Sequence, residues 1–145
     1  MNRFNKIILC SIPSAIFLYV FYLPQLNYYR ITRLTGWSNN TMSLLINVIS
    51  ILLLVSFVVL FYFITKRMLH DEKFKYIPTV SWIPFYIVFI LINNYTIPIT
   101  ESGDKPSPGT GILLILSYVL LPIILAFIIG ISTSYTKKQP RGLLV

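Results

Sequence analysis

Residues 42–65 read MSLLINVISILLLVSFVVLFYFIT, and this stretch decides the fold. It holds twenty-four consecutive residues without a charged side chain. As an α-helix it would be about 36 Å long, which exceeds the roughly 30 Å hydrocarbon core of a bilayer. Backbone groups in lipid must be hydrogen-bonded within the segment, so we expect a membrane-spanning helix here.

Three more uncharged blocks occur at 7–23, 77–99 and 111–133. None of them alternates apolar and polar residues, as the strands of a membrane barrel would. The whole chain is 56% hydrophobic and only 11% charged, whereas about a quarter of the residues of a soluble domain are charged. The sequence therefore predicts an all-α polytopic membrane protein, in which residues 1–145 form a single domain with four transmembrane helices.

The first block also resembles a secretory signal peptide, because the basic segment 1–6 precedes it. A cleaved signal would end in a site of small residues of the A-x-A type. No such site follows Leu23, so we expect 7–23 to be an uncleaved first helix.

The basic residues are distributed unevenly between the two sides of the predicted membrane. Nine of the twelve Lys and Arg residues lie in the N-terminus, the loop 66–76 and the tail 134–145. The connections 24–41 and 100–110 hold the other three. Cytoplasmic loops carry the excess of Lys and Arg, so we expect both termini and 66–76 in the cytoplasm. This topology predicts a multi-pass protein of the cytoplasmic membrane.

The predicted cytoplasmic loop 66–76 holds four of the twelve Lys and Arg residues, two of the four acidic residues and the only histidine. Its candidate residues are Lys66, Arg67, His70, Asp71 and Glu72. We interpret them as a topological anchor whose bases also attract anionic lipid headgroups. The alternative is a metal or acid–base site, but a metal needs three or four ligands and the chain has one histidine. We expect no metal and no cofactor, and if the protein senses a cytoplasmic ligand or partner, this loop is where we expect it.

The two outer connections differ in composition. Tyrosine, tryptophan and arginine in 24–41 favour a short interfacial helix that ends at Gly36, followed by an Asn-Asn-Thr start of the next span. The Gly- and Pro-rich segment 100–110 has the composition of a plain turn.

Neutral polar residues form a predicted layer in the outer half of the membrane. Its members are Asn47, Asn93, Asn94 and Ser117. Ser43 and Ser50 share the helix face of Asn47 because they lie four and three residues from it. Two interpretations stay open, namely hydrogen bonds that hold helices together and a polar pocket open to the outside.

The short loop 66–76 predicts that its two flanking helices are antiparallel neighbours. That arrangement would bring Asn93 or Asn94 toward Asn47 or Ser117. We also expect the first and last helices to approach closely in their cytoplasmic halves, because both carry pairs of small residues there. The pairs are Ser11 with Ala15, and Ala126 with Gly130.

Prolines occur inside three of the predicted helices, at Pro13, Pro84 and Pro122. A proline in a helix removes one backbone hydrogen bond and tends to kink the helix. We interpret these residues as determinants of helix shape, with a hinge used in gating as the alternative.

The spans contain no ionisable side chain, although such residues mark ion paths and proton relays. Chain length and helix number resemble those of the small multidrug exporters, but their glutamate in the first helix has no counterpart in 7–23. Nucleotide-binding, hydrolase and metalloprotease motifs are also absent.

We therefore expect a small, non-catalytic integral membrane protein that acts as an accessory, immunity or regulatory subunit through helix–helix contacts. The alternative is an oligomeric small transporter or channel for a neutral or lipophilic solute. The expected partners are the lipid bilayer and another membrane protein or a second copy of the chain, with no nucleic acid. The abundance of Ile, Asn, Lys and Tyr hints at a bacterial source with an AT-rich genome.

Overall fold

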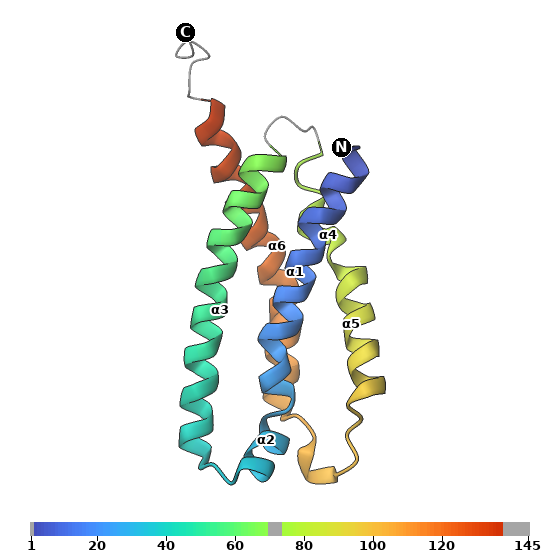
Figure 1. The fold of residues 1–145 in the computed structure, drawn as a ribbon, viewed down its shortest axis with the longest axis vertical. Helices are drawn as coiled ribbons and strands as arrows, with labels where there is room; N and C mark the ends of the chain where they lie inside the picture. The colour runs from blue at the N-terminus through green and yellow to red at the C-terminus, as the bar shows by residue number, and fades with distance from the viewer. Residues whose placement is uncertain (1, 70–73, 138–145) are drawn as a thin grey trace.

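The protein is a bundle of long helices (Figure 1). A computed structural model describes the backbone of residues 2–69 and 74–137, and the side chains up to residue 134. The elements are α1 (Arg3–Leu26), α2 (Tyr28–Thr35), α3 (Asn39–Met68), α4 (Pro78–Ser81), α5 (Ile83–Thr96), the 3₁₀-helix η1 (Ser102–Asp104) and α6 (Pro108–Lys137). No strand occurs in the described part of the chain, in agreement with the predicted all-α class.

Three of the helices are long and apolar enough to cross a membrane. They are α1, α3 and the part of α6 from Pro108 to Ser134. They run alongside one another, and the start of α1 and the end of α6 lie at the same end of the bundle (Figure 1). The structure is thus compatible with a membrane protein, as the sequence predicts.

The apolar block 77–99, the third in chain order, is divided between α4 and α5, which meet at Trp82. Pro84 has no N–H to donate to the carbonyl of Val80, and this missing bond explains why the helix is interrupted there. The sequence predicted a single helix over 77–99 with a tendency to kink at Pro84. α5 alone is 14 residues long, which corresponds to only about 21 Å. By contrast, Pro13 and Pro122 lie inside uninterrupted helices.

α1 is the central helix of the bundle. It packs against α3 on one side and against α4 and α5 on the other, while α6 packs against α3 and α4. Within the described residues, α3 contacts neither α4 nor α5. The prediction that the helices flanking 66–76 are neighbours is therefore wrong. A connection of nine residues can reach about 30 Å, which is enough to pass across an intervening helix packed 8–10 Å away.

Large side chains of α1, α3, α4–α5 and α6 fill the centre. The fully buried ones include Tyr22, Phe61, Trp82, Tyr86, Leu125 and Ile129. Trp82 stacks on Tyr118 with ring centroids 5.9 Å apart, and Tyr86 meets both rings edge-on. These aromatic contacts hold the α4–α5 segment against α6.

α1 approaches α6 closely at only a few points and packs far more extensively on α3, α4 and α5. Ser11 instead forms a hydrogen bond with Ser81 of α4. The side-chain atom nearest to a Cβ built on Gly130 is the hydroxyl of Tyr76, at 3.9 Å. At this level the segment that leads into α4 therefore occupies the place where we expected a direct contact between α1 and α6.

Candidate functional site

An open cleft of about 480 Å³ lies at the end of the bundle opposite the chain termini. It is enclosed by the end of α1, the first turns of α3 and α6, and α2. The lining residues are Phe21, Gln25, Tyr28, Tyr29, Ser43, Ile46, Asn47, Ser50, Ser107, Thr110 and Leu113. This volume is within the range of small-molecule sites in proteins.

The polar face of α3 forms one wall of this cleft. Ser43, Asn47 and Ser50 all line it, as expected from their spacing on one helix face. Within the described structure the Asn47 side chain forms no hydrogen bond, although a side-chain amide can form several hydrogen bonds. Asn47 thus keeps donors and an acceptor available for a bound group.

An apolar pocket of about 110 Å³ adjoins the cleft. Phe21 lines both cavities, and the pocket extends from it between α1, α3 and α6. The rings of Phe17 and Phe57 stack at 4.0 Å on its wall. Ser117, a member of the predicted layer, also lines this pocket.

Two tyrosines of α1, which the sequence analysis did not identify, form hydrogen bonds with Asn93 and Ser117 of the predicted layer. Tyr22 donates to the carbonyl of Leu113, at 2.8 Å, and also forms a hydrogen bond with Ser117. Tyr19 donates to the amide oxygen of Asn93, at 3.1 Å. A sequence signal existed, because positions 19 and 22 are three residues apart and so share a helix face.

The predicted polar layer is thus divided among several sites. Asn93 is buried against Tyr19 of α1, and Asn94 is exposed on the outside of α5. In the described structure α5 has no contact with α3, and it meets α6 through the rings of Tyr86 and Tyr118. Within that part of the chain neither asparagine forms a hydrogen bond with Asn47 or Ser117, so the expected approach is wrong. The central position of α1 is the reason, because it separates α5 from α3.

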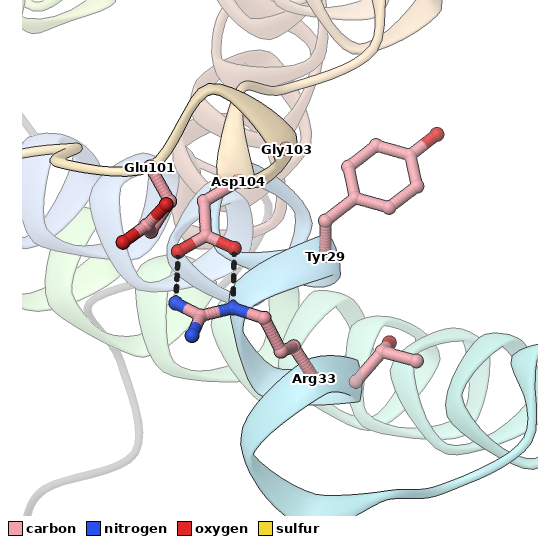
Figure 2. Close-up of a pocket in the computed structure, with 6 residues that line it drawn as sticks. Tyr29, Arg33, Glu101, Gly103 and Asp104 are labelled. Carbon is pink, nitrogen blue, oxygen red and sulfur yellow. Dashed lines mark hydrogen bonds and ion pairs between the residues drawn. The ribbon is translucent and has the colours of Figure 1, made fainter.

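An arginine–carboxylate cluster joins the two connections at this end of the bundle (Figure 2). Arg33 of α2 donates two hydrogen bonds to Asp104 of η1, from Nε at 3.1 Å and from the terminal nitrogen at 2.6 Å. Arg30 lies 3.5 Å from the same carboxylate and donates to the carbonyl of Pro98 at 2.6 Å. The segment 100–110 is therefore not a plain turn, because it contains η1 and a carboxylate that is only 3% exposed.

The arginines set the charge state of this cluster. Hydrogen bonds from Arg33 lower the pKa of Asp104 below its usual value, and the charges of Arg33 and Arg30 act in the same direction. Asp104 is consequently ionised at neutral pH and compensates part of the positive charge of α2.

α2 connects the cluster to the cleft. Tyr29 lines the cleft and also a cavity of about 310 Å³ beside Arg33 and Asp104 (Figure 2). Tyr28 donates to the carbonyl of Asn39 at the start of α3, at 3.0 Å. α2 is thus held at both sides, by η1 and by α3, and it forms the outer rim of the cleft.

The candidate residues of the loop 66–76, which the sequence predicted to be cytoplasmic, are only partly described. Lys66 and Arg67 are exposed in the last turn of α3, where Lys66 lies 5.9 Å from the ring centroid of Tyr62. His70, Asp71 and Glu72 lie outside the described residues. Within the described part, no three His, Cys, Asp or Glu side chains are grouped so that they could hold a metal ion.

Comparison of the chain with protein-family models, curated proteins and solved structures finds no match.

Proposed function

We propose that the chain is a four-span protein of the bacterial cytoplasmic membrane, with both termini and the connection between α3 and α4 in the cytoplasm. The charge distribution supports this orientation. Arg3 and Lys6 begin α1, and Lys66 and Arg67 end α3 at the same end of the bundle (Figure 1). At the other end Asp104 compensates the arginines of α2.

In this proposal α4 and α5 together form one more span, the third in chain order, in addition to α1, α3 and α6. With Trp82 between them, the segment from Pro78 to Thr96 has 19 residues, which corresponds to about 28 Å of helix. An interruption is tolerated at membrane depth where protein buries it, and Trp82 at the break is 0% exposed.

Within the membrane, the protein acts as a non-catalytic accessory subunit that binds another membrane protein through helix–helix contacts. The observation that supports this proposal is the exposed position of Asn94 on α5. Its side chain is exposed, and the described residues include no hydrogen-bond partner for it. A neutral amide facing hydrocarbon is stabilised by a hydrogen bond to a neighbouring helix. Among the described residues, α5 packs along α1 and meets α6 through the Tyr86–Tyr118 ring contact, so much of its apolar surface is left exposed.

Site-specific photocrosslinking in the native cell tests this surface. A photoreactive residue at Leu91, which is 62% exposed one turn from Asn94, should crosslink to one membrane protein. The matched control is Leu52 of α3, which is 61% exposed on another helix and should give lipid adducts alone. The partner should co-purify in stoichiometric amount with the native chain and with Asn94→Gln, but not with Asn94→Leu.

A second candidate function is transport of a neutral solute by an oligomer, and the cleft at the outer end favours it. For this candidate, crosslinks at Leu91 would join two copies of the chain, and the purified oligomer would carry a solute flux in liposomes. Equal lipid adducts at positions 91 and 52, with no protein crosslink and no flux, would overturn both candidates.

A further inference from the structure

The cleft and the apolar pocket lie next to each other and differ in polarity, and together they would make one amphipathic site. The cleft presents the amides of Gln25 and Asn47 and the hydroxyls of Ser43 and Ser50. The pocket presents mainly aromatic and aliphatic side chains. Phe21 is common to both. A molecule that occupies both cavities must therefore have a polar part and an apolar part.

The polar part must be uncharged. None of the described residues that line the cleft carries a charge. The nearby arginines are already bound to Asp104 and to the carbonyl of Pro98. A charged group in the cleft would lose hydration without gaining an opposite charge, whereas hydroxyl and amide groups would find neutral partners.

The apolar part lies at the depth of lipid chains. Leu54, which lines the pocket, is seven residues from Asn47 on α3, and this spacing corresponds to about 10 Å along the helix. Leu54 is also at the middle of α3, and so near the middle of the bilayer in the proposed topology. Leu54 and Leu120 are 41% and 45% exposed, so the pocket is open sideways to the hydrocarbon.

We propose that this site binds a lipid with an uncharged, hydroxyl-bearing headgroup, such as a diacylglycerol, with the headgroup beside Asn47 and one aliphatic chain beside Leu54. The lipid enters from the bilayer through the opening between α3 and α6. The stacked rings of Phe17 and Phe57 contact the chain and limit how deeply it enters.

This inference rests on the membrane topology of the proposed function, but it does not depend on the partner protein. The test uses purified full-length protein in phosphatidylcholine nanodiscs, with a diacylglycerol that carries a diazirine in the middle of one acyl chain. Photolabelling should be concentrated in the peptides of α3 and α6 that contain Leu54 and Leu120. Unlabelled diacylglycerol should compete, whereas phosphatidic acid with the same chains and glycerol alone should not.

Matched variants test whether the lipid binds in the cleft and the apolar pocket. Asn47→Leu should weaken competition by diacylglycerol about three- to tenfold, as expected for the loss of one or two hydrogen bonds in a membrane. Asn94→Leu makes the same chemical change on α5 and should leave competition unchanged. Leu54→Trp keeps the polar cleft and fills the pocket, so it should abolish labelling even if Asn47→Leu fails to fold.

Three outcomes would overturn the inference. They are equal competition by phosphatidic acid, equal labelling of the two asparagine variants, and labelling spread over α5 as well. Since no partner is present in the nanodiscs, a failure here would leave the crosslinking result at Leu91 unaffected. A failure of that crosslinking would likewise leave the lipid result unaffected.

Discussion

The burial and ion pairing of Asp104 depend on residues from another part of the chain. Its own segment, 100–110, is rich in Gly and Pro and has the composition of a turn. The arginines that bury it come from α2, more than 70 residues earlier. Because Arg33 is bidentate, this contact is among the stronger and more specific kinds of ion pair.

The first prediction concerns the pH dependence of stability. The folded-state pKa of Asp104 is lowered, so its stabilising effect is complete above the unfolded pKa of about 3.9 and is lost as pH falls through the folded value. Asp104→Asn should therefore lower the thermal unfolding temperature in detergent at pH 7. The difference from the native chain should shrink as the pH falls below about 4.

Glu101 provides the control for this prediction, because it is an exposed carboxylate on the same connection. Glu101→Gln should leave the unfolding temperature almost unchanged at pH 7. If both variants destabilise the protein equally, the effect comes from net charge and the Arg33–Asp104 contact contributes nothing specific.

At the scale of elements, α2 is the clearest agreement between sequence and structure. A short helix ending at Gly36 was predicted, and the structure has α2 at Tyr28–Thr35 with Gly36 as its C-cap. Gly36 has φ of +68°, a left-handed conformation that glycine adopts without strain. The next helix is capped by Ser38, whose hydroxyl accepts a hydrogen bond from the N–H of Thr41, rather than starting from the Asn-Asn-Thr signal alone.

The second prediction tests this cap. Gly36→Ala should destabilise the protein by about 1–2 kcal/mol, the cost of the left-handed conformation for a residue with a Cβ. No atom lies within 4 Å of the added Cβ, so steric clash adds nothing. Unfolding by denaturing detergent would measure the change.

The matched control is Gly111→Ala in the first turns of α6, where the added Cβ also meets no atom within 4 Å. At this position φ is not positive, so alanine should be neutral or stabilising by up to about 1 kcal/mol. Equal effects of the two substitutions would show that the backbone conformation of Gly36 does not limit stability.

The sequence predicted a helix where α4 and α5 lie, but it did not predict the break between them at Trp82. Pro84 was recognised as a residue that disturbs a helix. Whether such a proline bends a helix or interrupts it depends on its surroundings, since Pro13 and Pro122 leave their helices uninterrupted. At Pro84 the buried Trp82 donates to the carbonyl of Thr79, at 2.7 Å, and stabilises the interrupted form.

At the scale of the whole molecule, the number of membrane crossings decides which surfaces face which compartment. The third prediction uses single cysteines in a Cys10→Ser background. With four spans, Ser102→Cys should react with an impermeant thiol reagent added outside intact cells, whereas His70→Cys should react only after the inner face is opened. If α4 and α5 did not cross the membrane, positions 70 and 102 would react from the same side.

The chain's apolar blocks determined the helical class and the approximate limits of the long helices, because lipid requires continuous backbone hydrogen bonding and an apolar surface. Spacing along one helix also placed Ser43, Asn47 and Ser50 on a common face. These features depend on residues close together in the sequence. Composition and local periodicity are sufficient to predict them.

The order of the helices around α1 was decided by tertiary structure alone. All four apolar blocks lack charged side chains, so burial in lipid does not select which pairs are neighbours. That selection came from shape and from specific contacts, such as Trp82 on Tyr118 and Tyr19 on Asn93. The separation of Asn93 from Asn47, the contact of Arg33 with Asp104 and the position of Phe21 between two cavities all follow from this packing.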